Sequence, residues 1–368
     1  MREFKILAVL IVVVGVLYWG VEPLAHSVFH PKAAPADFEF RDLARIDLSK
    51  GNKERGEELF QGNCQNCHNL KAKGFKSEQS EMAGVVMPDL STAGAIYNEN
   101  FLAAFIINPA QAVKLEHKDY MMPPYFAQGE DENLEQEVAD IVAFLKSIGE
   151  ASLKQAVNFN DEFIAKQEAI EKSNLPESQK NEAIENARAH ITDKVIFLDA
   201  CSRCHSIKYD EPKTAEQIAA NNQKKVDIEA YLGAKAPDLS MMIRSKGEHY
   251  LEWFINDPQK KSYKEIKDAI LLEDANANFS TNTKKFEWQE DEDFSNLAKE
   301  MGVLPVGLSM PRVGLNEESQ KRVVRYLESI GDSKKAERES LGISIIIFFG
   351  VLSIFAYLWK RKKWKDLH

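Results

Sequence analysis

The organisation of this chain follows from one short stretch, Cys64-Gln65-Asn66-Cys67-His68, which returns once as Cys201-Ser202-Arg203-Cys204-His205. C-x-x-C-H is the attachment signature of c-type haem, in which two thiols form thioethers and the histidine ligates the iron. The two motifs contain all four cysteines of the 368-residue chain. The sequence therefore predicts two covalently bound haem c groups and no disulfide bond.

Two other uses of paired cysteines fit this sequence less well. A zinc ribbon separates its two C-x-x-C pairs by roughly 15 to 20 residues, and the separation here is far larger. A thioredoxin-like redox motif lies next to a βαβ pattern, and the sequence shows none.

The length of the chain allows two or three modest domains, and acidic residues outnumber basic ones by 57 to 47. The excess of negative charge argues against nucleic acid as a partner. Basic residues gather instead at the C-terminus, where five lysines and arginines stand between residues 360 and 368.

An apolar segment lies near each end of the chain. Residues 6–21 are uncharged and follow Arg2 and Lys5, the layout of a signal sequence. No A-x-A cleavage site follows directly, which favours an uncleaved anchor over a removed signal peptide. Residues 341–359 are uncharged and precede the basic tail, as expected for a membrane-spanning helix. The positive-inside rule then places both termini in the cytoplasm and the body of the chain in the periplasm, where haem is attached.

The two halves of the body repeat one series of elements, which indicates an internal duplication. A helix over residues 53–63 leads into the first motif, residues 101–106 form a middle helix, and residues 134–148 form a closing helix that Gly149 ends as a C-cap. The second half repeats the middle helix at residues 250–256 and the closing helix at residues 322–330, with Gly331 as its stop.

The repeat is imperfect in two respects. Asp193 stands where the first half has Gly56, so a close helix crossing is less well supported in the second half. Residues 206–235 and 259–302 have the character of insertions, and the latter carries an acidic run at residues 287–293. A solvated loop is the plain interpretation of that run, and docking of a basic electron acceptor is the functional one.

An iron used only for electron transfer needs a second axial ligand that excludes water, and a methionine sulfur in that position raises the potential relative to histidine. Met122 and Met310 each directly precede a proline in the loop before the closing helix. We predict these two methionines as the ligands, with Met121 as the fallback. Bis-histidine ligation through His117 and His249 is the alternative.

Each half, with these motifs, resembles a class I cytochrome c over residues 50–150 and 190–332. The resemblance implies that the carbonyls of Pro88 and Pro237 receive hydrogen bonds from the ligand histidines His68 and His205. The expected fold is mainly α, with two tandem class I cytochrome c domains joined by a helical linker and a transmembrane helix at each end. The expected segments are an anchor at 1–24, a spacer at 25–50, cytochrome c domains at 51–150 and 191–332, a linker at 151–190, a transmembrane helix at 341–359 and a basic tail at 360–368.

The C-terminal anchor behind a Pro-Asp-Leu-Ser loop, a Met-Pro loop and a closing helix is similar to cytochrome c1 of the bc1 complex. The duplicated units, the start Met1-Arg2-Glu3-Phe4-Lys5 and the apolar run through Leu17-Tyr18-Trp19 to Val21 resemble its dihaem epsilonproteobacterial form. This resemblance implies a bacterial inner-membrane subunit of a quinol:cytochrome c oxidoreductase, with no stand-alone turnover. The implied partners are a cytochrome b subunit, a Rieske iron–sulfur protein, and a soluble cytochrome c or terminal oxidase. Ordinary cytochrome c1 has one haem and one anchor, so the resemblance leaves open which haem accepts electrons from the Rieske centre. We favour the His205 haem. The alternatives are the dihaem subunit of a cbb3-type oxidase and a dihaem peroxidase.

Overall fold

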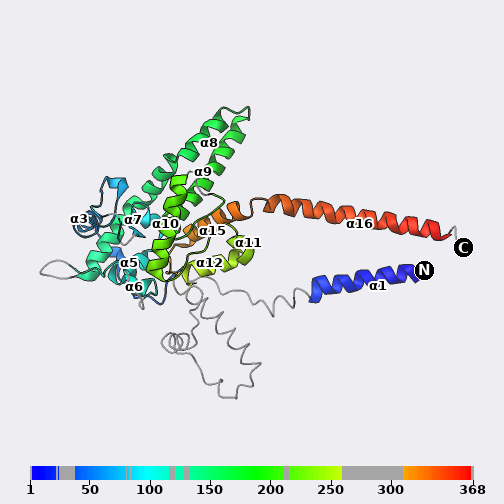
Figure 1. Cartoon of the computed structure of the whole chain (residues 1–368), viewed down its shortest axis with the longest axis horizontal. Helices are drawn as coiled ribbons and strands as arrows, with labels where there is room; N and C mark the ends of the chain where they lie inside the picture. Colours follow the sequence, from blue (N-terminus) through cyan, green and yellow to red (C-terminus); the bar gives the residue numbers. More distant parts are fainter. Residues whose placement is uncertain are drawn as a thin grey trace, which may run out of the picture.

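The computed structural model describes residues 2–21, 24, 38–79, 81–82, 85–115, 121–127, 133–210, 215–258 and 310–365. This part of the chain is mainly α-helical, with one short antiparallel pair of strands, β1 (Glu81–Met82) and β2 (Val85–Val86). Figure 1 shows a helical body from which a helical hairpin and the two terminal helices project.

The first half of the body is built from three main helices, α3 (Lys53–Asn63), α5 (Glu99–Ile107) and α7 (Leu134–Asn158). Their starts follow from asparagine caps, because Asn52, Asn98 and Asn133 each accept a hydrogen bond from a backbone N–H of the first turn. Shorter helices complete this half: η2 (Leu48–Lys50), η3 (Lys71–Lys73), α4 (Ala93–Ile96) and α6 (Pro109–Ala112). The bounds expected for α3 are confirmed.

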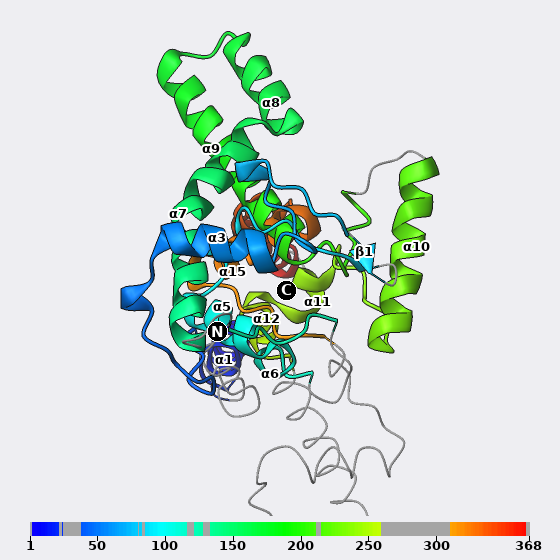
Figure 2. The same ribbon diagram turned by 90° about the vertical axis from the view of Figure 1, so that its left-hand side faces the viewer.

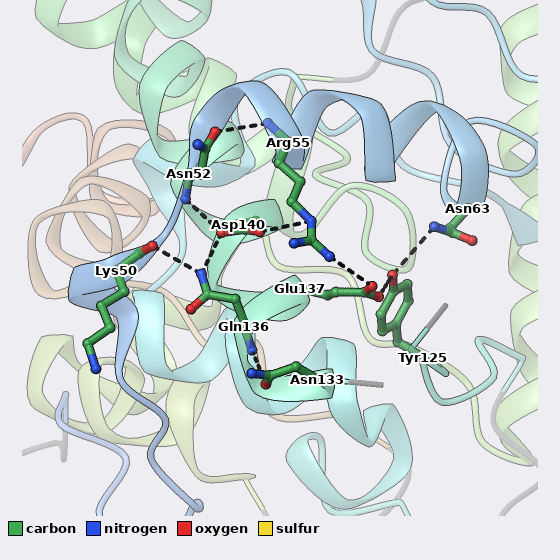
Figure 3. Close-up of polar contacts among 9 residues, drawn as sticks. All are labelled: Lys50, Asn52, Arg55, Asn63, Tyr125, Asn133, Gln136, Glu137 and Asp140. Carbon is green, nitrogen blue, oxygen red and sulfur yellow. Dashed lines mark hydrogen bonds and ion pairs between the residues drawn. The ribbon is translucent and has the colours of Figure 1, made fainter. Parts of the chain in front are cut away.

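The crossing of α3 and α7 is very close. A Cβ atom on Gly56 would lie 2.0 Å from the carbonyl oxygen of Asp140, so only glycine allows the two backbones to meet there. A polar network surrounds the crossing (Figure 3): Asp140 accepts a 2.7 Å hydrogen bond from the Asn52 N–H, and Arg55 lies 3.4 Å from Glu137. Phe60 and Phe144 pack beneath it with their ring centroids 5.8 Å apart.

The expectation that Gly149 ends the closing helix is wrong. Helix α7 runs through Gly149 and continues to Asn158. A Cβ atom on Gly149 would lie 2.4 Å from the backbone nitrogen of Ala95, and one on Gly94 would lie 2.1 Å from the carbonyl oxygen of Leu145. Both glycines serve the packing of α4 against α7, and neither marks a helix end.

The second half contains α9 (Glu177–Ala200), α10 (Ala215–Leu232), α11 (Met242–Lys246), α12 (Glu248–Asn256) and α15 (Glu317–Gly331). Helix α8 (Asp161–Glu171) and the first part of α9 form the hairpin that projects in Figure 1. The expected linker is therefore helical, but its boundaries at 150 and 190 fall inside α7 and α9. Helices α7 and α9 therefore each run across one of the expected domain boundaries.

A buried ion pair takes the place of glycine where α9 crosses α15. Asp193 is 3% exposed, and its carboxylate oxygens lie 2.6 and 2.9 Å from Arg325 and 3.1 Å from Arg322. In the second half, α9 and α15 thus also pack as a pair. Ion pairs join these helices where a glycine allows close backbone contact in the first half.

The two halves pack directly on each other. Tyr97 and Leu315 form a β-bridge, flanked by hydrogen bonds from the Asn98 N–H to the Gly314 carbonyl (2.9 Å) and from the Asn316 N–H to the Ile96 carbonyl (3.0 Å). Gly314 has a φ of +77°, and the ring of Phe101 fills the space that its Cβ atom would occupy. The halves form one packed body.

The terminal helices are α1 (Arg2–Val16), which continues as the π-turn η1 (Leu17–Val21), and α16 (Lys335–Lys365). Residues 4–21 and 340–365 are long and apolar enough to cross a membrane. The rings of Phe4 and Tyr357 lie 6.0 Å apart edge to face, and both termini lie at the same end in Figure 1. The basic residues expected to form a separate tail from 360 continue the helix to Lys365.

Candidate haem-attachment sites

The first C-x-x-C-H motif forms a tight turn directly after α3. The Cys64 N–H donates to the Phe60 carbonyl (2.8 Å), which closes the last turn of the helix. The N–H groups of Cys67 and His68 then both donate to the Cys64 carbonyl, at 3.1 and 2.8 Å. This turn holds both cysteines and the histidine at one place in the fold.

The second motif has the same backbone hydrogen bonds at the end of α9. The Cys201 N–H donates to the Phe197 carbonyl (2.8 Å), and the N–H groups of Cys204 and His205 donate to the Cys201 carbonyl at 3.2 and 3.0 Å. The repeat that the sequence indicates is therefore also a repeat of local structure.

Each motif histidine lies against a proline carbonyl. His68 Nδ1 is 3.0 Å from the carbonyl oxygen of Pro88, and His205 Nδ1 is 2.9 Å from that of Pro237. When Nδ1–H donates to these oxygens, the lone pair of Nε2 is left for a metal. The contacts are those that the family resemblance implies for histidines that ligate a haem iron.

An aspartate holds each proline loop in place. Asp89 accepts hydrogen bonds from the N–H groups of Ser91 (2.9 Å) and Lys71 (3.3 Å). Asp238 accepts the matching pair from Ser240 (3.0 Å) and Lys208 (2.8 Å). Each carboxylate thus ties its proline loop to the segment after the motif histidine, which fixes the carbonyl that orients the imidazole.

The environment of the cysteines fits haem attachment better than the other uses of paired cysteines. All four thiols are free and half-buried. Burial raises the pKa of Cys64 and of Cys201 to about 12, whereas a thioredoxin-like motif depends on a lowered thiol pKa. In the part of the chain that the structure describes, no three His, Cys, Asp or Glu side chains gather closely enough to hold a metal ion.

Apolar side chains surround both motifs, as a porphyrin ring requires. Cys64 packs against the cluster that contains Phe60, Leu70 and Leu102. Cys201 packs against a second cluster, made by α9, α11, α12 and α15. A thioether-bound ring at either motif would therefore meet a hydrocarbon wall, and the residues present fit haem c.

The two Met-Pro loops precede α7 and α15, as expected, and Met122 and Met310 are half-buried. The first loop is tied down by Tyr125, whose N–H donates to the Ile106 carbonyl (3.1 Å) and whose hydroxyl donates to Glu137 (2.7 Å; Figure 3). The role of both methionines as ligands stays a prediction. Of the alternative ligands, His117 lies outside the described residues, and the side chain of His249 is 91% exposed on α12.

The comparisons with known proteins identify one family in the first half of the chain. Residues 53–149 match the family described as Cytochrome c. That segment holds the first motif, the Pro88 loop and the first Met-Pro loop, so the chain contains a cytochrome c domain, which implies covalently bound haem c. No solved structure matches the chain.

Two relatives extend the comparison. The chain is 27% identical over 164 residues to the ammonia monooxygenase gamma subunit of Nitrosomonas europaea, an alignment that covers 42% of this chain and 64% of that protein. It is 37% identical over 59 residues to cytochrome c1 of Allochromatium vinosum, covering 15% of this chain and 24% of that protein. The chain thus spans less than two thirds of the length of either relative. It contains a cytochrome c domain and is distantly similar to cytochrome c1 over part of its length.

Arg203 and Tyr97 link the second attachment motif to the first half of the body. The pKa of His68 in the first motif is lowered, first because His68 is buried and also because the positive charge of Arg203 lies near it. Arg203 itself belongs to the second motif. Its side chain also forms a hydrogen bond with the hydroxyl of Tyr97, a residue that packs against both core clusters. No sequence signal marks either residue, because their roles depend on the contact between the two halves.

We predict that Arg203→Gln lowers the reduction potential of the His68 haem, because a nearby cation favours the reduced iron, which carries one positive charge less. The potential should be measured by a spectroscopic redox titration of a Cys201→Ser/Cys204→Ser chain, which we expect to keep this haem alone. Arg203→Lys, which retains the charge, should restore most of the potential. An equal potential with arginine and glutamine would show that the charge does not act on this haem.

Proposed function

We propose that this protein is a membrane-anchored dihaem cytochrome c and the cytochrome c1-type subunit of a quinol:cytochrome c oxidoreductase. In this role it passes electrons from a Rieske iron–sulfur protein to a soluble cytochrome c or a terminal oxidase. Its body lies on the periplasmic side of a bacterial inner membrane, beside a cytochrome b subunit. Haem supplies the one-electron chemistry when bound, and the protein supplies its orientation and surroundings.

The observation that carries the dihaem part of the proposal is the repeated site. Both motifs have the same turn, and His68 and His205 make the same contact with a proline carbonyl, at 3.0 and 2.9 Å. At His205, as at His68, a hydrogen bond from Nδ1–H to the proline carbonyl leaves the lone pair of Nε2 for a metal. The second site therefore supports a second haem c held by Cys201 and Cys204.

The placement of the membrane helices supports the cytochrome c1 part of the proposal. Helix α15 ends at Gly331 and α16 begins at Lys335, so residues 332–334 alone connect the last helix of the second half to a helix of spanning length. Residues 22–37 separate the N-terminal helix from the first half. Of these, only Leu24 belongs to the described residues. This short connection supports the proposal that the His205 haem, held near the membrane, is the acceptor of electrons from the Rieske protein.

Isolation of the intact complex from membranes tests the assignment. A cytochrome b and a Rieske protein that purify with this chain would support the proposal. A copper–haem oxidase core in their place would instead identify the dihaem subunit of a cbb3-type oxidase. Turnover of hydrogen peroxide by the purified protein, with one five-coordinate haem in its spectrum, would identify a peroxidase.

The predicted methionine ligands have a spectroscopic test. Met122→Ala and Met310→Ala should each abolish the methionine-to-iron absorption band of one haem and lower the potential of that haem, because a thioether ligand favours reduced iron. Each single variant should lose about half of the band of the native protein, and the double variant should lose all of it.

Met121→Ala is the matched control for the first of these variants, since Met121 is the neighbouring methionine on the same loop. The band should survive in Met121→Ala if Met122 is the ligand. Loss of the band in Met121→Ala and its survival in Met122→Ala would move the assignment by one residue.

A further inference from the structure

Helix α10 belongs to the stretch of the second half that has no counterpart in the first. It lies between His205 and the Pro237 loop in the sequence, and Figure 2 shows it at the edge of the molecule, beside β1. The ammonium group of Lys224, on α10, donates a 2.5 Å hydrogen bond to the carbonyl oxygen of Ser202. Since Ser202 lies between Cys201 and Cys204, α10 is tied to the second attachment turn.

The same helix also reaches the first half. The hydroxyl oxygen of Tyr231 accepts a 2.9 Å hydrogen bond from the backbone N–H of Met121, which is 110 residues earlier in the chain. Met121 directly precedes Met122, the predicted ligand of the first haem. One hydrogen bond from the second half therefore fixes the backbone from which the ligand side chain extends.

Apolar contacts hold α10 in this position. Ile228 and Leu232, on the face of α10 next to Tyr231, are 2% and 7% exposed. They belong to one core cluster with Phe101, Val113 and Leu115 of the first half. Because this cluster includes residues from α5 and α6, helix α10 packs directly against the first half.

The described part of the ligand loop, residues 121–127, is thus held from two sides. Tyr125 fastens it to α7 of its own half through Glu137, and Tyr231 fastens it to α10 of the other half. If the loop moves away from the first attachment site, the Met121–Tyr231 hydrogen bond has to break.

We propose that α10 is a brace through which the second haem unit positions the axial-ligand loop of the first, with Tyr231 as the positioning residue. This inference rests on the proposed ligand role of Met122. The brace stabilises the closed form of the loop, in which the Met122 sulfur would hold the haem iron and external ligands would be kept out. It also makes the ligation of the first haem depend on the folding of the second unit.

Competition between the methionine and an added ligand tests the brace. Imidazole binds the oxidised iron only when the methionine has left, so its apparent affinity follows the fraction of open loop. Loss of one hydrogen bond in Tyr231→Phe should raise that affinity roughly 2- to 13-fold at one haem. Lys224→Met, which frees α10 from the attachment turn, should act in the same direction at the same haem.

Two variants make the outcome specific. Tyr209→Phe is the matched control, because this tyrosine of the second half is 64% exposed, and it should leave imidazole binding unchanged. In a Met310→Ala chain, Tyr231→Phe should weaken the one methionine band that remains, and in a Met122→Ala chain it should change no band.

The outcomes separate the brace from the ligand assignment. If Met122→Ala abolishes a band and Tyr231→Phe leaves imidazole affinity at that haem unchanged, the brace proposal is overturned and the ligand assignment stands. If Tyr231→Phe alters both haems equally, the effect is general loosening and the brace is also overturned. If Met122→Ala leaves both bands intact, the ligand assignment itself fails.

Discussion

A chain in which Cys201 and Cys204 are both serine should carry one covalently bound haem instead of two. Serine cannot form the thioether bonds that hold the ring, although the turn around His205 depends only on backbone groups and can persist. The first site shares none of its thiols, its histidine or its proline carbonyl with the second. The expected loss is therefore half of the haem per polypeptide.

A pyridine haemochrome assay on the purified protein, normalised to polypeptide, measures this ratio directly. The mass of the peptide that contains the second motif should fall by one haem at the same time. Cys64→Ser/Cys67→Ser is the matched variant and should also leave one haem, at the other motif. A native ratio of one haem per chain, unchanged by the Cys201/Cys204 variant, would restrict haem to residues 53–149 and remove the dihaem proposal.

The variant should also unfold at a lower temperature than the native protein. Cys204 packs in the cluster formed by α5, α6 and α10, and Cys201 packs in the cluster that includes Ile96 of the first half. A bound ring would extend both clusters, so its loss exposes apolar surface where the halves meet.

The local features of this fold could be read from the sequence because each depends on residues close together in the chain. The C-x-x-C-H spacing sets the turn, and Asn52 before Lys53 sets the start of α3. The repeat predicts a helix over residues 250–256, and α12 spans Glu248–Asn256. The proline loops could be placed because Pro-Asp-Leu-Ser occurs after both motifs.

The features that the sequence could not predict depend on contacts between distant segments. A glycine after an apolar stripe has two physical explanations, a helix end and a close packing contact, and at Gly149 the second applies. Asp193 breaks the repeat with Gly56, but only the approach of α15 shows that Arg322 and Arg325 neutralise it. The hydrogen bond from Met121 to Tyr231 joins residues 110 positions apart, and no pattern in the sequence predicts it.

The helix crossing in the first half depends on glycine, whereas the crossing in the second half depends on the Asp193 ion pairs. We therefore expect a large loss of stability in Gly56→Ala. The added methyl group would lie 2.0 Å from the carbonyl oxygen of Asp140 and 2.8 Å from the Cβ atom of Phe144. The nearest atoms belong to the α7 backbone and cannot rotate away, so α3 and α7 must separate. Overpacking of a core commonly costs 1–3 kcal/mol and sometimes more; with backbone as the obstacle we expect a loss of about 3 kcal/mol or more in the free energy of unfolding.

Gly62→Ala provides the matched control, because it makes the same chemical change six residues later on the same helix. Nothing lies within 4 Å of the Cβ position at Gly62, so alanine there should be neutral or gain up to about 1 kcal/mol from its higher helix propensity. Guanidinium unfolding of the full-length protein, followed by far-ultraviolet circular dichroism, compares the two variants. Equal midpoints would mean that α3 and α7 do not cross at Gly56. A large difference would show that the first half of the body depends on the backbone contact between α3 and α7 at Gly56. In the second half, the matching position holds the ion pairs of Asp193.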